Sequence, residues 1–99
     1  MTELTSNEIR EKIESGDKFL LDFYATWCGP CRVLMHNLSV VEGDLNIPVF
    51  TYNVDSDPRF TQEFGVRSVP TLKLFDGGQI INSGSGLMSN PQIKSFVEV

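Results

Sequence analysis

A nearly continuous apolar run at residues 19–25 restricts the fold of this 99-residue chain more than any other feature. The run reads Phe-Leu-Leu-Asp-Phe-Tyr-Ala, and successive side chains of a strand point to opposite faces of a sheet. Because both sets of side chains are apolar, we expect a central strand that is covered on both faces, with Asp22 as its only charge. Such a strand requires a layer of helices on each side.

Helix and strand signals alternate around this run. A capping box at Thr5 and Glu8 predicts a short first helix that ends at Gly16. A second capping box, at Ser89 and Gln92, predicts a last helix. The other predicted elements are a helix over residues 30–42, a strand over 48–54, a helix from 58 to 65 behind an Asp57 cap, and a hairpin of strands 71–75 and 79–83.

This order of elements predicts an α/β fold. Strands that alternate with helices and then end in a hairpin favour a central mixed β-sheet with helices on both faces, closed by a C-terminal antiparallel hairpin plus helix. Residues 1–99 are expected to form a single domain. In the helix over residues 30–42 we expect Gly43 to act as the stop, and the predicted apolar face is Val33, Leu34, Leu38 and Val41.

The only two cysteines stand two residues apart, directly after the central strand, in the sequence Trp27-Cys28-Gly29-Pro30-Cys31. Thiol–disulfide exchange needs an accessible thiolate and a second thiol close enough to resolve the mixed disulfide. If the helix begins near Pro30, its free N–H groups and dipole favour a thiolate at Cys28, whereas Cys31 lies one turn further in. The expected order is that Cys28 attacks and Cys31 resolves.

Two other roles for the pair are open from the residues alone. A structural crosslink across so short a loop removes little chain entropy and is unstable in a reducing cytosol. Half of a zinc site would need two further ligands, and the chain offers only His36 besides the two thiols. The pattern therefore favours redox chemistry, with no metal and no cofactor.

Composition excludes several classes of function. The chain carries 13 acidic and 8 basic side chains, a net charge of -5, which argues against a nucleic-acid partner or an anionic membrane surface. The polar N-terminus has no apolar signal segment, and no run approaches the length of a membrane span. We therefore expect a cytoplasmic protein.

Three landmarks together resemble the thioredoxin family: Asp22 in a strand before the cysteines, the cysteine motif itself, and Ser68-Val69-Pro70-Thr71 ahead of the hairpin. The resemblance covers essentially the whole chain. It implies a thioredoxin-like fold and a protein-disulfide reductase that carries electrons from a thioredoxin reductase to disulfide-containing proteins. By family analogy ribonucleotide reductase is one acceptor, and a monomer is expected.

The resemblance also implies roles for individual residues. Pro70 would follow a cis peptide bond and face the cysteines, and Val69 would pair with an extended substrate segment. Asp22 would be buried behind the cysteines with a raised pKa and relay a proton for Cys31. The implied substrate surface comprises Trp27, Gly29, Pro30, Val69, Pro70 and Gly86.

Each of these residues also has an ordinary structural reading. Asp22 could be a strand-end residue turned to solvent, Pro70 a trans loop proline, and Trp27 a core aromatic. His36 stands where the family usually has a proline, and we expect only an exposed helix residue there, without a catalytic role.

Two further departures from the family pattern concern the site and the sheet edge. Thr51 stands where many relatives have a lysine near the buried aspartate, and Ser85 replaces a common apolar residue. Without that lysine, we expect Asp22 to stay protonated to higher pH. The first edge strand is expected to be reduced to residues 2–4 or to be absent.

Three rival functions remain open at this point. One is a disulfide oxidant or isomerase on the same fold, although such relatives tend to carry a histidine where this chain has Pro30. A glutaredoxin is disfavoured because the usual Pro-Tyr pair and a basic cluster are missing. The third is a binding module, a subunit of another enzyme that would use the same surface without redox chemistry.

Overall fold

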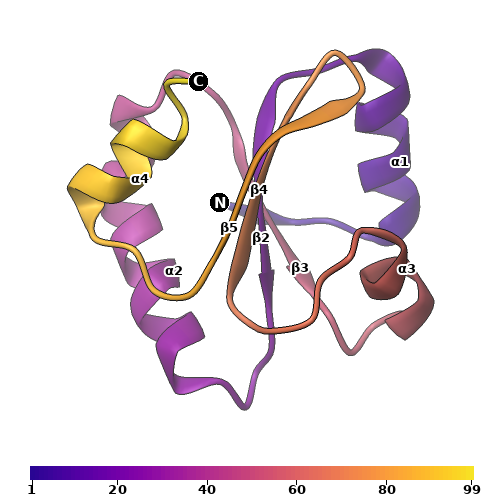
Figure 1. Cartoon of the computed structure of the whole chain (residues 1–99), viewed down its shortest axis with the longest axis horizontal. Coiled ribbons are helices and arrows are strands. Elements are labelled where there is room, and N and C mark those ends of the chain that lie inside the picture. Colours follow the sequence, from indigo (N-terminus) through magenta and orange to yellow (C-terminus); the bar gives the residue numbers. More distant parts are fainter.

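The computed structural model describes residues 1–99 and consists of a five-stranded sheet between two layers of helices (Figure 1). Helices α2 and α4 cover one face of the sheet, and α1 and α3 cover the other. The elements in chain order are β1 (Thr2–Glu3), α1 (Ser6–Ser15), β2 (Phe19–Tyr24), α2 (Gly29–Val41), the 3-10 turn η1 (Glu42–Asp44), β3 (Val49–Asn53), α3 (Pro58–Glu63), β4 (Thr71–Asp76), β5 (Gln79–Ser85) and α4 (Asn90–Phe96).

The strands lie in the order β1-β3-β2-β4-β5, so β2 is central. Strands β1, β3 and β2 are parallel, whereas β4 is antiparallel to both β2 and β5. In this register Asp22 lies between Thr51 on β3 and Leu72 on β4. The predicted mixed sheet with a C-terminal hairpin is confirmed, and the first edge strand is reduced to two residues.

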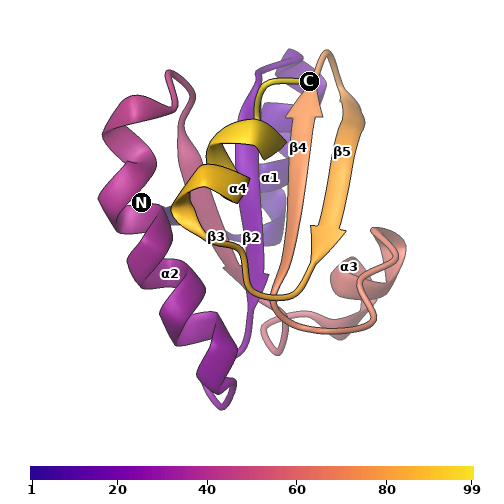
Figure 2. The ribbon, with the colours of Figure 1, turned by 60° about the vertical axis from the view of Figure 1, so that its left-hand side comes forward.

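Each face of the sheet carries its own core. On the α2 and α4 face, Leu20 and Leu74 pack with Leu34 and Leu38, and Figure 2 shows α4 crossing in front of the middle strands. The opposite core is rich in aromatic rings from the sheet and α3. Burial on both faces explains why residues 19–23 are completely inaccessible.

The predicted helix caps are present. Thr5 accepts a hydrogen bond from the N–H of Glu8, and the Glu8 carboxylate accepts one in return from the Thr5 N–H. The Ser89 capping box and the Asp57 cap are formed as well. Gly16 ends α1 with a φ of 74°, a left-handed conformation that favours glycine.

Two sequence predictions about α2 are wrong. Gly43 does not stop α2, because the helix continues at Glu42 into the 3-10 turn and Gly43 has no positive φ. Val33 is 48% exposed, since the buried stripe of α2 runs through positions 31, 34, 38 and 41. On β4 the polar residues Thr71 and Lys73 are buried together with their apolar neighbours.

The longest helix has 13 residues, and no helix combines the length and apolar character that a bilayer crossing needs.

Candidate active site

The two cysteines lie at the end of the molecule where β2 passes into α2 (Figure 1). Cys28 is the N-cap residue of α2, and its Sγ accepts a hydrogen bond from the Cys31 N–H at 3.2 Å. The pair forms a disulfide with a Cα–Cα distance of 5.3 Å, which is ordinary for such a bond. A sulfur at this position faces free N–H groups and the positive end of the helix dipole, which favour its thiolate when the bond is reduced.

Both sulfur-bearing residues are shielded from solvent to different degrees. Cys28 is 5% exposed and Cys31 is 1% exposed, and both pack with Ala25. Val54 and Val69 cover the cluster from the side. Cys28 is therefore the slightly more exposed of the two cysteines.

The loop before β4 lies against the disulfide. The Val69–Pro70 peptide bond is cis, as expected, and the Val69 carbonyl oxygen lies 3.8 Å from Cys28 Sγ. The Gly86 N–H donates to the Pro70 carbonyl oxygen at 2.9 Å, and the Thr71 hydroxyl donates to the Ser68 carbonyl oxygen at 2.8 Å. These bonds fix the loop whose Val69 contacts Cys28; Pro70 itself is buried, whereas Gly86 is exposed.

Trp27 lies on the surface and not in the core, with 69% of its side chain exposed. Its indole N–H donates to the Asp55 carboxylate at 3.0 Å, and the Asp55 N–H donates to the Asn53 side chain. The sequence analysis did not predict this contact. No local pattern in the sequence predicts this contact, because it depends on β2 and β3 lying parallel and ending at the same edge of the sheet.

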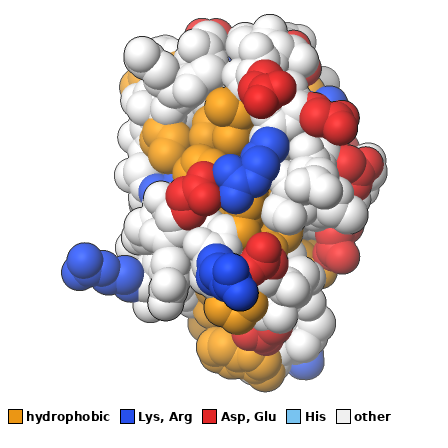
Figure 3. Space-filling model, turned by 90° about the vertical axis from the view of Figure 1, so that its right-hand side faces the viewer, with side chains coloured by type: hydrophobic (Ala, Val, Ile, Leu, Met, Phe, Trp, Pro, Cys, Tyr) orange, Lys and Arg blue, Asp and Glu red, His pale blue; other side chains and the backbone are white.

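A shallow groove of about 170 Å³ runs along one side of Trp27. Val54, Val66 and Val69 give it an apolar floor, and Arg67 and Ser68 stand at its side. Figure 3 shows hydrophobic side chains gathered at the lower end of the molecule, where β2 enters α2. An apolar surface of this kind beside a reactive sulfur can receive a polypeptide segment.

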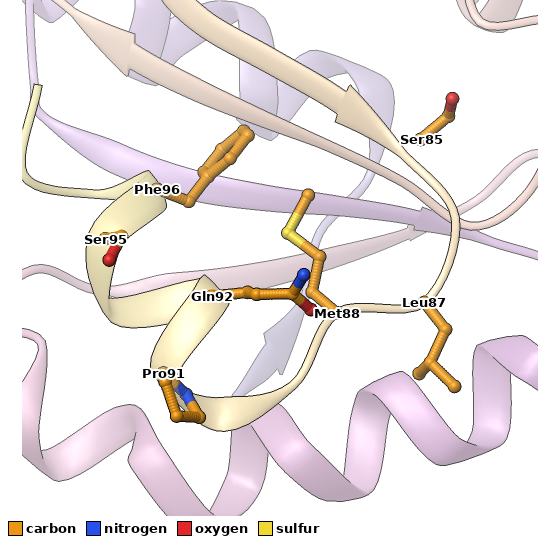
Figure 4. A pocket seen from close by; sticks show the side chains of 7 residues that line it. All are labelled: Ser85, Leu87, Met88, Pro91, Gln92, Ser95 and Phe96. Atoms are coloured by element: carbon orange, nitrogen blue, oxygen red, sulfur yellow. The ribbon is translucent and has the colours of Figure 1, made fainter.

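A second hollow of about 560 Å³ lies beyond Gly86, between the end of β5 and α4. Figure 4 shows Met88 and Phe96 reaching toward the sheet, while Leu87, which is 50% exposed, points toward α2. A Cβ on Gly84 would come within 2.8 Å of Met88 and 3.1 Å of Phe96, so this wall is closely packed.

Asp22 is fully buried in the centre of the sheet, so the solvent-exposed reading is wrong. It shares a sheet face with Leu20 and Leu72, the face that α2 covers. Neither carboxylate oxygen has a hydrogen-bond partner, and Thr51 opposite supplies no positive charge. Burial raises the pKa of Asp22 from 3.8 to about 7.

The remaining sequence candidates have simple placements. His36 is exposed on α2, as expected, and Gly29 and Pro30 are exposed in the first turn of that helix. The zinc alternative needed further ligands, and no group of three or more His, Cys, Asp or Glu side chains lies together. The structure thus brings together the residues around the disulfide, with Asp22 behind them in the sheet.

A cysteine pair that opens a helix at the end of the central strand of a mixed sheet is the arrangement of a thiol–disulfide oxidoreductase. Comparison with known proteins agrees with this class. The family model described as Thioredoxin matches residues 1–99, and the chain belongs to the thioredoxin family.

Individual relatives resemble the chain over most of their length. The thioredoxin of Alicyclobacillus acidocaldarius subsp. acidocaldarius is 34% identical over 95 residues, which are 93% of this chain and 90% of that protein. The oxidised structure of mitochondrial thioredoxin 3 from Saccharomyces cerevisiae is 32% identical with a TM-score of 0.84, over 100% of this chain and 95% of the other. A mutant thioredoxin from Halobacterium salinarum NRC-1 is 30% identical with a TM-score of 0.86, over 100% and 91%. The predicted thioredoxin-like fold and thiol–disulfide reductase class are therefore confirmed.

Proposed function

We propose that this chain carries electron pairs from a thioredoxin reductase to disulfide-containing proteins, with Cys28 as the attacking and Cys31 as the resolving sulfur. The observation that carries the proposal is the hydrogen bond from the Cys31 N–H to Cys28 Sγ at the open end of α2. This contact and the helix dipole stabilise negative charge on the outer sulfur.

The reaction begins when the Cys28 thiolate attacks one sulfur of a substrate disulfide. The substrate S–S bond breaks, its second sulfur leaves as a thiolate, and a mixed disulfide forms. Cys31 then loses its proton and attacks Cys28 Sγ, which breaks the mixed disulfide and releases the first substrate sulfur as a thiolate. The substrate gains two electrons and the chain ends with the Cys28–Cys31 disulfide.

Asp22 is the proposed acceptor of the Cys31 proton. Its pKa of about 7 lies closer to that of a thiol than the pKa of an ordinary aspartate, so proton transfer between them costs less. Cys31 precedes Leu34 by one turn on the buried stripe of α2, and Leu34 packs on the sheet face to which Asp22 belongs. A water molecule can complete the path between the two groups.

The substrate segment would dock as an extended strand beside Val69. Its backbone can pair with the Val69 main chain, and Trp27 and the apolar groove receive its side chains. The exposed Gly29, Pro30 and Gly86 would complete the contact surface, together with any part of the largely buried Pro70 that a substrate can reach beside Val69. We propose these residues as the substrate site.

The cellular setting is also a proposal. We propose a cytoplasmic monomer of one domain that uses no metal or cofactor of its own and accepts ribonucleotide reductase among its substrates. Cell fractionation tests the cytoplasmic location, and sedimentation tests the monomeric state. A single cooperative unfolding transition tests the one-domain organisation. Turnover of purified ribonucleotide reductase in the presence of this protein tests the last.

The decisive assay for the proposed function is insulin disulfide reduction with electrons supplied by a thioredoxin reductase. The protein should accelerate reduction, Cys28→Ser and Cys31→Ser should each abolish turnover, and the exposed control His36→Ala should keep it. A protein that folds but does not reduce insulin would contradict the proposal. A variant with both Cys28→Ser and Cys31→Ser tests the binding-module alternative. If cells that need this protein grow normally with that variant, the protein acts by binding and not by redox chemistry.

A further inference from the structure

Lys73 is an unusual residue because it is a cationic side chain that is almost fully buried on an inner strand of the sheet. It lies in the middle of β4, only 7% exposed, opposite Leu21 on β2 and Ser83 on β5. This sheet face is the one on which Leu21 and Phe75 form the aromatic-rich core. A lysine among such neighbours is costly unless its charge has a counterpart.

The charge of Lys73 has no counterpart within the protein. Its Nζ donates to the Ser83 hydroxyl at 2.8 Å, which uses one of three N–H donors. The ion pairs of the chain join other groups, at the N-terminus and at Arg10 and Lys94. Burial accordingly lowers the pKa of Lys73.

Lys73 lines a small pocket of about 220 Å³ between β5 and the segment that follows α3. Apart from glycines, the walls carry only cationic and hydroxyl side chains: Lys73, Arg67, Ser68, Thr71, Ser83 and Ser85. No carboxylate lines the pocket. Arg67 is exposed and makes no ion pair, so its guanidinium is available as well.

We propose that this pocket is a binding site for a single oxyanion group. A phosphate or carboxylate would accept hydrogen bonds from the Lys73 ammonium, from the Arg67 guanidinium and from the nearby hydroxyls. Two cationic side chains, Lys73 and Arg67, line this pocket without any carboxylate, although the whole chain has a net charge of -5. The pocket is large enough for one tetrahedral anion with some water, and too small for a nucleotide or an extended polyanion.

The pocket adjoins the proposed substrate groove. Arg67 and Ser68 line both cavities, and Val69 next to them faces the disulfide. The oxyanion therefore has two sources: free phosphate from solution, or an acidic side chain of a protein docked beside Val69. If the oxyanion is an acidic side chain, the pocket selects acidic protein substrates, and this reading rests on the proposed function. Binding of free phosphate does not depend on the proposed function.

The first experiment is a titration of the oxidised full-length protein with inorganic phosphate, followed by amide NMR at constant pH and ionic strength. We expect saturable shifts at Ser68, Ser83 and Ser85. Lys73→Met should weaken binding at least tenfold, because a charge-assisted hydrogen bond is lost. The control Lys94→Met removes the same charge from the opposite face of the sheet and should leave the affinity within about twofold, as expected for an exposed charge.

Shifts that never saturate, or that persist unchanged in Lys73→Met, would overturn the proposal. Should Lys73→Met fail to fold, Arg67→Gln provides the second variant, because Arg67 is exposed and its loss removes the other cation without touching the core. An unchanged phosphate affinity in Arg67→Gln would equally count against the site.

The second experiment distinguishes the sources of the oxyanion. Two disulfide-bridged peptides that differ only by Glu or Gln are compared as substrates of the reduced protein. A higher kcat/KM for the Glu peptide that disappears in Lys73→Met assigns the site to substrate recognition. Equal values, together with saturable phosphate binding, assign it to a free anion. Because the phosphate titration involves no cysteine chemistry, its failure and the failure of the proposed function can be told apart.

Discussion

Asp22 should make the stability of the oxidised protein fall as the pH rises. Burial without any hydrogen-bond partner raises its pKa in the folded protein to about 7, whereas the unfolded chain has the ordinary value near 3.8. Between these values the folded protein binds the proton more tightly than the unfolded chain does. The stabilisation is therefore complete below about pH 4 and is lost as the pH rises through about 7.

The size of the effect follows from the two pKa values. One pKa unit corresponds to about 1.4 kcal/mol, so a rise from 3.8 to about 7 amounts to about 4 kcal/mol. Asp22→Asn keeps the shape of the side chain and removes the titration. The free energy of unfolding of Asp22→Asn should therefore be close to that of the unmodified protein at pH 4 and exceed it by about 4 kcal/mol at pH 8.

Urea denaturation of both oxidised proteins at the two pH values measures this difference. Other titrating groups are common to both proteins and cancel in the comparison. If the two curves stay equally separated at pH 4 and pH 8, Asp22 does not titrate in this range, and the explanation by burial is wrong.

Three other predictions concern single side chains. Thr51→Lys places an ammonium opposite Asp22 and should lower the pKa of that carboxyl, as followed by carbon-13 NMR; an unchanged titration would refute the role of the missing cation. Gly16→Ala should lower the free energy of unfolding in urea by about 1 kcal/mol, because Gly16 has a φ of 74°. Gly43→Ala should leave it unchanged, since Gly43 has no positive φ. Equal effects of the two substitutions would contradict a left-handed end at Gly16 alone. Trp27→Ala should raise KM for insulin without changing the melting temperature, since its side chain is 69% exposed, and loss of stability would place it in the core.

Local signals in the sequence predicted the elements and their caps because those features depend on a few adjacent residues. The capping boxes at Thr5 and Ser89 and the buried strand over residues 19–24 are of this kind. The class of chemistry was equally accessible, because the spacing of Cys28 and Cys31 already fixes what two thiols can do.

Features that depend on tertiary packing could not be predicted in the same way. The burial of Asp22 and Lys73 is decided by helices and loops that pack from distant parts of the chain. Val33 and Leu34 are both apolar neighbours, and only the orientation of α2 on the sheet selects Leu34 for the core. The contact between Trp27 and Asp55 likewise depends on β2 and β3 ending side by side.

The most direct test of the account is to trap the first covalent intermediate. Reduced Cys31→Ser protein is mixed with an oxidised substrate protein, and the products are digested and analysed by mass spectrometry. We predict one mixed disulfide, located at Cys28, because that sulfur caps α2 and is the one within reach of the substrate groove. Absence of any adduct at Cys28 would contradict the proposed mechanism.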